Sequence, residues 1–323
     1  MIQALTLGKV TFPINLIQGP LAGVSCAPFR ELAWKYSRPA FSCTEMISAK
    51  TLQQSSQMLP KRYIHKSSEE GPVCYQLSSN NCDELAEVTK KITDYGADLI
   101  DLNCGCPVKK IRQQGRGSRL LADPKQLFHL ISAIKNNTHV PVSIKIRVDG
   151  ESNDRYNEEI AQVISDSGLD FLIVHGRHWQ DSYEVKCHYN QIKFFVSSLK
   201  IPVIGNGDVR DLDSLKKMFN TGCAGVMISR AGVGQPWLIN ELAAAWKNEY
   251  FAPPSVVDIK GMLLTHVEKL ILLLNNEKAA IVQARKFAPY YARSLSRKIE
   301  FCQALNKCYS LKTFIQICDH YFQ

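Results

Sequence analysis

The sequence has no apolar run long enough to cross a bilayer. Its longest apolar cluster, residues 270–274, follows the charged residues Glu268 and Lys269. It falls far short of the ~20 residues that a membrane-spanning helix needs. The first residues lack the basic segment and long apolar stretch of an export signal. The 11 cysteines follow no spacing typical of a secreted disulfide scaffold. We therefore expect a cytoplasmic protein with reduced thiols and no membrane segment.

Two common binding motifs are also missing. Cys104 and Cys106 form a Cys-x-Cys without a second pair at zinc-finger spacing, so we expect no metal site. No Gly-x-Gly-x-x-Gly motif follows the first buried run, which argues against an open dinucleotide-binding sheet. Hydrophobic residues make up 45% and charged residues 21% of the chain, values that exclude a disordered or fibrous protein.

What the sequence does contain is a repeating alternation of apolar runs and helical patterns. A short strand pair is predicted around Gly8, and a helix is predicted to begin at Pro28. The predicted strands cover residues 14–20, 40–45, 73–77, 98–103, 142–147, 171–175, 203–206 and 225–230, and the helical patterns cover 83–95, 124–135, 157–167 and 211–220. Eight such units predict a closed (β/α)8 TIM barrel more than an open sheet.

From about residue 245 the strand pattern stops and the rest of the chain is predicted to be helical. Residues 251–255, Phe-Ala-Pro-Pro-Ser, have the composition of a linker. We therefore divide the chain into a barrel domain, 1–244, and an all-helical domain, 245–323. The second domain holds 11 Lys and Arg against six Asp and Glu, over half of the net charge of +9. Such an excess favours a polyanionic partner, with a merely soluble basic protein as the alternative.

The chain changes character abruptly at residues 98–117. An apolar strand ends at Asn103 and is followed by Cys104-Gly-Cys-Pro107, which places Cys106 on a loop at the carboxyl end of the strand. The next segment, 108–117, is basic and contains glycine, so we expect it to be mobile and to face an anion. TIM barrels carry their catalytic groups at this end of the strands.

Polar residues also follow the other predicted strands, and together they indicate an enzyme. They are Gln18, Pro20, Glu45, Gln76, Asn103, Cys106, Lys145, Arg147, His175, Arg177, Asn206, Asp208, Ser229 and Arg230. Glycines follow the last two strands, at 205–208 and 229–232, where barrels commonly bind phosphate, and Arg230 adds a fork of donors. The alternative is a pair of glycine turns with a surface arginine.

Lys145 lies inside an otherwise apolar strand, and a buried lysine is costly without a partner. We expect it to point into the barrel mouth as a Schiff-base nucleophile or as a cation facing an electron-rich ring or phosphate. A structural ion pair is the third possibility. His175 precedes Gly176 and Arg177 at a strand end, which favours a ligand contact over a core histidine.

Together these motifs resemble the tRNA-dihydrouridine synthases, flavin enzymes that reduce uridine in the tRNA D-loop. The matching segments occur in family order over almost the whole chain: residues 19–24, Gln76, 103–107 with Lys109 and Lys110, Lys145, 175–177, 206–208 and 227–237. The last segment resembles the bacterial B-type subgroup, which suggests uridine 17. Leu21 replaces a usual methionine, His178 a threonine and Ser229 a glycine, and Arg119 stands where a small residue is usual.

The resemblance implies a site for FMN and a site for tRNA. Residues implied to bind FMN are Pro20, Leu21, Ala22, Gln76, Lys145, His175, Asn206, Gly207, Asp208, Ser229 and Arg230. Residues implied to bind the tRNA are Asn103, Lys109, Lys110, Arg177, Arg285, Lys286, Arg293 and Arg297. We expect the protein to act as a monomer.

The resemblance also implies a reaction. NADPH, or NADH, reduces FMN, hydride passes to C6 of uridine, and Cys106 protonates C5 as a general acid. That role needs a thiol, and an ordinary cysteine with a pKa of ~8.5 is mostly protonated at neutral pH. Lys109 and Lys110 would lower this pKa if they lay near the sulfur, so we expect them to face tRNA phosphates.

In the helical domain, Arg293 and Arg297 are four residues apart and are predicted to share a helix face. Tyr290 and Tyr291 lie nearby for base stacking. A helix break at Pro289 would take Arg285 and Lys286 off that face. Two other functions stay open: an FMN-dependent barrel acting on a small pyrimidine, as in dihydroorotate dehydrogenase, and an RNA-binding protein without activity.

Overall fold

The computed structural model describes residues 1–54, 61–149 and 154–323. Its main sheet closes into a ring, because β4 (Ser42–Cys43) pairs with both β3 (Leu16–Gln18) and β6 (Val73–Ser78). The ring continues in parallel through β7 (Leu99–Cys104), β8 (Val142–Arg147), β9 (Phe171–His175), β10 (Val203–Asn206) and β11 (Gly225–Ile228) back to β3. A ninth strand, β5 (Ile47–Ser48), pairs only with β6. The described residues thus confirm the TIM barrel.

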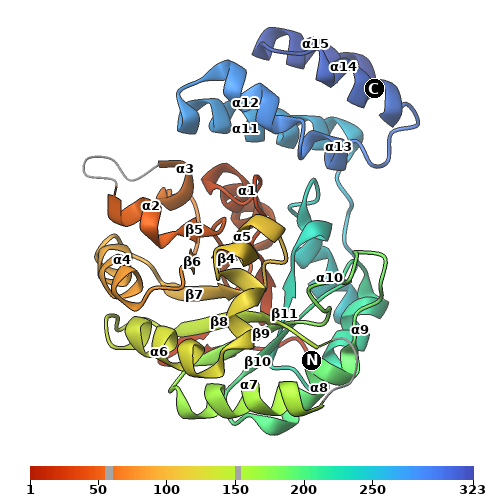
Figure 1. Cartoon of the computed structure of the whole chain (residues 1–323). Helices are drawn as coiled ribbons and strands as arrows, with labels where there is room; N and C mark the ends of the chain where they lie inside the picture. The colour runs from red at the N-terminus through yellow and green to blue at the C-terminus, as the bar shows by residue number, and fades with distance from the viewer. Residues whose placement is uncertain (55–60, 150–153) are drawn as a thin grey trace.

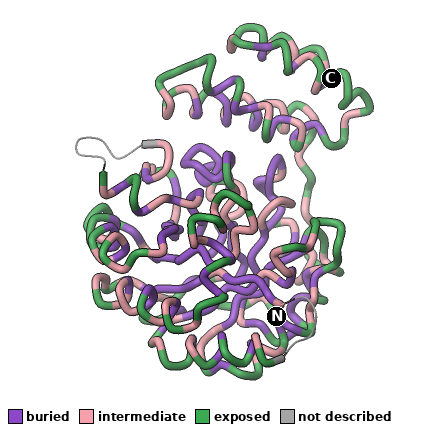
Figure 2. The backbone as a smooth tube through the Cα atoms, in the orientation of Figure 1, coloured by how far each residue is buried: buried purple, intermediate pink, exposed green. Residues whose placement is uncertain are grey.

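The strands are mostly apolar because the barrel buries both of their faces. Every residue of β6, β7, β10 and β11 is buried, as Figure 2 shows for the centre of the barrel. The predicted strand pair is also present, as the antiparallel β1 (Leu5–Leu7) and β2 (Val10–Phe12). Its side chains pack with Phe41 and Phe171, which closes the core at the end of the barrel where the strands begin.

Helices cover the outside of the barrel (Figure 1). They are α1 (Ala27–Ser37), α4 (Cys82–Asp94), α6 (Pro124–Lys135), α7 (Asp154–Asp166), α8 (Tyr189–Ser198), α9 (Leu212–Phe219) and α10 (Leu238–Trp246), with the shorter α2 (Ala49–Gln54) and α3 (Lys61–Ile64). The predicted helix 124–135 coincides with α6. Helix α8 was not predicted, because its N-cap residue, His188, makes no capping hydrogen bond and several of its apolar residues are adjacent in the sequence.

The carboxyl-terminal part of the chain is all-helical, as predicted. It comprises α11 (Val256–Leu274), α12 (Glu277–Ala284), α13 (Ala288–Tyr291), α14 (Lys298–Asn306) and α15 (Leu311–Tyr321). Figure 1 shows these helices stacked over one end of the barrel. Their core includes Phe29 of α1 and Trp237 beside α10, so the helical unit shares apolar packing with the barrel. The proposed boundary between residues 244 and 245 falls inside α10, close to its end.

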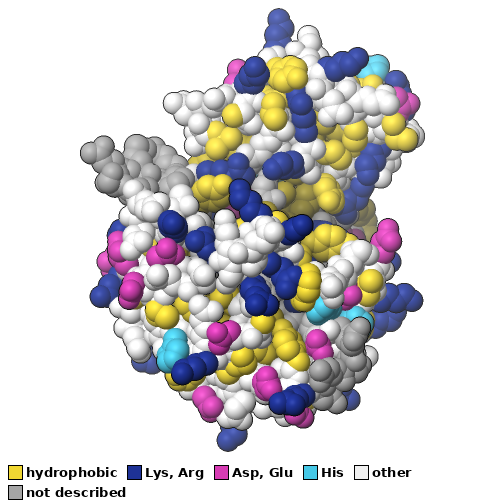
Figure 3. All heavy atoms as spheres, viewed as in Figure 1, with side chains coloured by type: hydrophobic (Ala, Val, Ile, Leu, Met, Phe, Trp, Pro, Cys, Tyr) yellow, Lys and Arg dark blue, Asp and Glu magenta, His cyan; other side chains and the backbone are white. Residues whose placement is uncertain are grey.

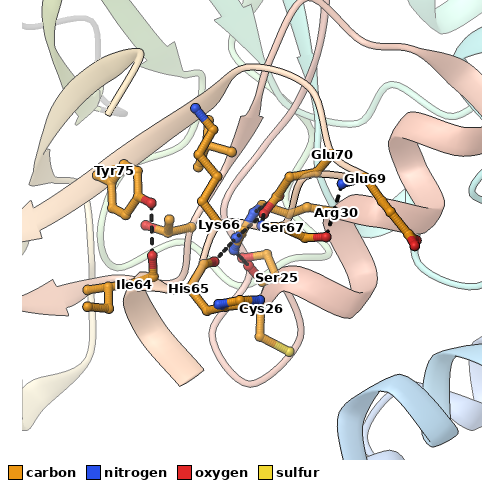
Figure 4. Close-up of polar contacts among 12 residues, drawn as sticks. Ser25, Cys26, Arg30, Ile64, His65, Lys66, Ser67, Glu69, Glu70 and Tyr75 are labelled. Atoms are coloured by element: carbon orange, nitrogen blue, oxygen red, sulfur yellow. Dashed lines mark hydrogen bonds and ion pairs between the residues drawn. The ribbon is translucent and has the colours of Figure 1, made fainter. Parts of the chain in front are cut away.

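A buried ion pair fixes the segment before β6 onto α1. Arg30 is fully buried and binds Glu70, with Nε–Oε2 at 2.6 Å and Nη2–Oε1 at 3.0 Å. The same guanidinium donates to the carbonyl oxygens of Ser25 and His65, and Glu70 also accepts from the Ser67 N–H (Figure 4). A paired and fully hydrogen-bonded charge of this kind holds a unique arrangement, and removing one partner is costly.

Two polar clusters join the helical unit to the barrel. Lys269 of α11 binds Glu31 of α1 at 2.5 Å and also binds Glu69. Arg62 binds Glu45 at 2.8 Å and also donates to Gln283 of α12. Both clusters lie beside the loops that follow β3 and β4, so the helical unit is attached at the end of the barrel where the strands finish.

Candidate active site

The carboxyl ends of the strands open into a cavity of about 1020 Å³. Of the residues predicted from the sequence, those that line it are Pro20, Leu21, Ala22, Gln76, Asn103, Cys106, Lys145, Arg147, His175, Arg177, Asn206, Gly207, Asp208, Ser229, Arg230, Tyr290 and Arg293. Tyr290 and Arg293 come from the helical unit, so the cavity lies where the two parts of the chain meet. Figure 3 shows Lys and Arg side chains gathered along the crease between them.

Cys106 lies on a loop that is fixed from both sides. Its N–H donates to Oδ1 of Asn103 at 3.0 Å. Its carbonyl oxygen accepts from the N–H of Ser118 at 3.0 Å and from the Ser118 hydroxyl at 3.1 Å. Gly117 approaches so closely that an added Cβ would lie 2.7 Å from the Cys106 carbonyl oxygen, and its φ is +61°. Only glycine fits there without strain.

The surroundings of the Cys106 sulfur favour the protonated thiol. Burial raises its pKa, while a hydrogen bond from the Val108 backbone and the charge of Arg147 act in the opposite direction. The nearby cation is therefore Arg147, and not Lys109 or Lys110, both of which are exposed. Cys104, by contrast, is fully buried in the barrel core. Cys106 is thus suited to donate a proton.

Lys145 points into the cavity and is held by an amide. Its Nζ donates to Oδ1 of Asn206 at 2.8 Å, and Asn206 Nδ2 donates in turn to the Met227 carbonyl oxygen at 2.8 Å. Burial, with a further contribution from the charge of Arg147, lowers the pKa of Lys145 to about 8. The Asn206 oxygen accepts from the amine as it would from a cation, while a lowered pKa is also what a Schiff-base lysine has, so both predicted roles stay open.

His175 lies among cations and is neutral. Burial lowers its pKa well below the ordinary value, and the charges of Lys145, Arg147, Arg177 and Arg230 lower it further. Four positive groups around one neutral imidazole make this wall of the cavity suited to an anion. Arg230 also stacks on the Tyr183 ring, with its guanidinium carbon 3.8 Å from the ring centroid.

Arg177 does not present its charge to the open cavity as a substrate-binding arginine would. It is 1% exposed, and its Nη2 binds both carboxylate oxygens of Asp208 at 2.7 and 2.8 Å. Its Nε donates to the Val185 carbonyl oxygen. Its Nη1 is buried and has no hydrogen-bond partner among the described residues. The predicted contact with tRNA is therefore wrong for most of this guanidinium, which instead orders the loop after β9.

The basic segment after Cys106 is folded over the mouth of the barrel. It forms α5 (Lys109–Gln113), which is followed by a 3-10 helix, Gly117–Ala122. The Arg112 guanidinium carbon lies 3.1 Å from the centroid of the Trp179 ring, and Arg116 donates to the Ser48 hydroxyl at 3.2 Å. The expectation of a mobile segment is thus replaced by a short helix with side-chain anchors on both flanks.

The predicted helix face with Arg293 and Arg297 does not exist, because the chain between α13 and α14 is not helical. Arg293 donates to Val233 and Gln235 beside α10. Nη1 of Arg297 lies 3.3 Å from Nε2 of His320 in α15. Pro289 lies in the first turn of α13, where a proline is tolerated, one turn later than the break that follows α12.

Two neighbouring predictions are also corrected. Tyr291 is 2% exposed and pairs through its hydroxyl with His266, so it cannot stack on a base, whereas Tyr290 is 40% exposed and lines the cavity. Arg285 donates to the Cys308 carbonyl oxygen and stacks on Tyr309, which places it inside the helical unit. Lys286 is exposed, and its Nζ would lie 3.0 Å from a Cβ added to Gly23.

Three buried residues of the site received no role from the sequence: Arg147 and Glu45 were named only among the polar residues at the strand ends, and Asp101 was missed. Arg147 donates to the Gly105 carbonyl oxygen at 2.9 Å and to that of His178 at 2.8 Å, so it links the Cys106 loop to the loop that follows β9. Asp101 is fully buried under the cavity. Glu45 accepts from the Gly23 N–H at 2.6 Å. The signal for Asp101 was available: an acid two residues before Asn103 on an apolar strand shares its face.

Comparisons with known proteins agree with this arrangement. A family described as Dihydrouridine synthase (Dus) matches residues 17–323. The chain is 30% identical to tRNA-dihydrouridine synthase B of Pseudomonas aeruginosa, over 93% of this chain and 90% of that protein. It is 30% identical to the protein of the same name from Xanthomonas campestris, over 98% and 95%. The Escherichia coli K12 protein of that name is 29% identical, over 98% of both chains.

Proposed function

The chain belongs to the dihydrouridine synthase family, and from this premise we propose that it reduces uridine to 5,6-dihydrouridine in the D-loop of tRNA. The observation that carries the proposal is the position of Cys106. A protonated thiol on a doubly anchored loop faces a cavity walled by cations, where a proton donor and an electron-rich ring can meet.

The residues of the cavity fit a flavin mononucleotide. Lys145 and Arg230 supply cationic donors for a phosphate and an electron-rich ring. Gly207 lines the cavity beside them. Pro20, Leu21 and Ala22 provide an apolar edge. We assign FMN to this wall of the cavity, with NADPH as the electron donor.

When bound, FMN supplies the hydride that adds to C6 of the uracil, having taken it from NADPH. Cys106 donates its Sγ proton to C5, and the resulting thiolate is stabilised by the charge of Arg147 until solvent returns a proton. Asn103 and Ser118 hold the peptide units on either side of the sulfur and so limit its position. Burial of the thiol keeps it protonated before the reaction.

The position of the helical unit supports tRNA as the substrate. It contributes Tyr290 and Arg293 to the wall of the cavity. The exposed Lys109 and Lys110 lie on α5, shortly after the Cys106 loop. A free pyrimidine would need neither contact. A uridine within tRNA would have to leave its stack to reach the cavity, which costs a few kcal/mol that phosphate contacts with Lys109 and Lys110 would offset.

The test is reduction of tRNA by purified Cys106→Ala enzyme. We expect the variant to be yellow and to consume NADPH, but to form dihydrouridine about 10²–10⁴-fold more slowly, the usual loss for a general acid. Cys82→Ala is the matched control, because Cys82 is also partly buried but lies on α4 outside the cavity. Unchanged dihydrouridine formation by Cys106→Ala would contradict the assignment, and reduction of free uracil would indicate a small-pyrimidine enzyme.

A further inference from the structure

A continuous chain of side-chain hydrogen bonds runs from the barrel core to the Cys106 loop. Asp101 accepts from the Ser143 hydroxyl through Oδ1 and from Gln76 Nε2 through Oδ2, both at 2.7 Å. Gln76 Oε1 accepts from Asn103 Nδ2 at 2.8 Å. Asn103 Oδ1 accepts from the Cys106 N–H at 3.0 Å. None of Asp101, Gln76, Asn103 and Ser143 is more than 8% exposed.

The direction of this chain is set at its inner end. An amide can be turned about so that its oxygen and nitrogen exchange places, but a carboxylate can only accept. Gln76 must therefore turn Nε2 toward Asp101, which leaves Oε1 for Asn103. Asn103 must then offer Nδ2 to Gln76, which leaves Oδ1 for the Cys106 N–H. A reversed Asn103 would meet that N–H with a donor and lose the bond.

We propose that Asp101 is a positioning residue for Cys106: its acceptor oxygen orients the Gln76 and Asn103 amides and so holds the loop that carries the thiol. The effect of Asp101 on tRNA reduction rests on the proposed function, whereas its effect on the position of the Cys106 loop does not.

The arrangement does not depend on the charge of Asp101. Burial raises the pKa of this carboxyl to about 7, so both forms are populated near neutral pH. In the neutral form the proton can lie on Oδ1 and be donated to the Ser143 hydroxyl, which is able to accept. Oδ2 then still accepts from Gln76, and the direction of the chain is unchanged.

The experiment measures the alkylation rate of Cys106 by iodoacetamide, read by mass spectrometry of its peptide in the purified full-length protein. Asp101→Leu removes the acceptor at similar size, frees both amides to turn, and loosens the loop. Because a loosened loop exposes the thiol and brings its pKa back toward the ordinary value, the rate should rise about tenfold at pH 7.5. The pH midpoint of alkylation should move down.

Two variants separate orientation from other roles of Asp101. Asp101→Asn keeps an acceptor for Gln76 and can donate to Ser143, so it should stay within about twofold of the natural protein. Ser143→Ala removes the other bond to Asp101 without altering the amides and should behave in the same way. If Asp101→Asn reacts as fast as Asp101→Leu, then charge and not orientation is what holds the loop, and the proposal is wrong.

A second variant, Gln76→Leu, interrupts the hydrogen-bond chain at the next residue, so the proposal can still be tested if Asp101→Leu does not fold. Gln76→Leu leaves Asp101 bound to Ser143 but disconnects Asn103, and it should raise the Cys106 alkylation rate to the same extent. An unchanged rate in Gln76→Leu would overturn the proposal. Because alkylation needs neither tRNA nor NADPH, these results stand whether or not the protein forms dihydrouridine. If it does, Asp101→Leu should slow tRNA reduction while leaving NADPH oxidation nearly unchanged.

Discussion

Cys106 combines two opposing influences that suit a group which gives up a proton and takes it back. Burial raises the pKa of the thiol and so keeps it protonated, whereas Arg147 lowers that pKa and so stabilises the thiolate. Arg147 is itself held by two carbonyl oxygens, those of Gly105 and His178. The same residue thus fixes the loop and adjusts its chemistry.

The pH dependence of tRNA reduction tests this balance. Because the proton-donating form of Cys106 is the thiol and its pKa is raised, the single-turnover rate should stay level through the ordinary cysteine pKa of ~8.5 and fall only above it. Arg147→Gln, which keeps a donor for the Gly105 carbonyl oxygen but loses the charge, should move the falling limb to still higher pH. A limb below pH ~8 in the natural enzyme would contradict a buried thiol as the donor.

At the scale of elements, the pairing of Arg30 with Glu70 shows how a segment without regular structure is fixed. The segment 65–72 contains no helix or strand. The His65 carbonyl oxygen nevertheless accepts from Arg30 of α1, and the Ser67 N–H donates to Glu70, so both residues are bound to this ion pair. Tyr75 of β6 adds a hydrogen bond to the Ile64 carbonyl oxygen at 2.8 Å, so the end of α3 is tied to the barrel as well.

Glu70→Gln should destabilise the protein strongly, because it leaves the Arg30 charge buried without a counter-charge. Breaking a buried ion pair in this way costs about 3–5 kcal/mol. Arg155→Met is the matched control, since its pair with Glu159 is exposed and such pairs contribute ~0.3–0.5 kcal/mol. Urea unfolding followed by circular dichroism measures both variants. Equal midpoints for Glu70→Gln and the natural protein would show that the Arg30 site tolerates an unpaired charge.

At the scale of the molecule, the helical unit and the barrel form one surface around the cavity. They share an apolar core that includes Trp237, and the clusters at Lys269 and Arg62 attach the unit beside the loops that follow β3 and β4. No helix of the described residues is long and apolar enough to cross a membrane. Basic side chains line the crease, which suits a large polyanion.

Two basic sites should respond differently when tRNA binding is measured against salt. Lys109 and Lys110 are exposed on α5, so replacing both by Gln should weaken binding and reduce the slope of log K against log salt by about one for each phosphate that is no longer neutralised. Arg293 donates to Val233 and Gln235, so Arg293→Gln should lower the melting temperature and leave the slope almost unchanged. A flat salt dependence in the natural protein would rule out phosphate binding as the main source of affinity.

The amino-acid sequence by itself determined the barrel and most of the side chains that line its cavity. Both depend on local patterns: β8, β9 and β10 have the predicted bounds, and polar residues at strand ends reach the mouth in any parallel barrel. The sequence also placed Cys106 on the loop after β7, because the apolar run ends at the cysteine pair.

Only the tertiary structure decided which atoms remain free to bind a ligand. Arg177 and Arg293 carry the right charge for an anion, but most of their donors are taken by Asp208, 31 residues away, and Val233, 60 residues away. Asp101 likewise acquires its role from Gln76, 25 residues earlier. Such partners meet only when the chain closes, because hydrogen bonds between distant segments leave no pattern in either segment alone.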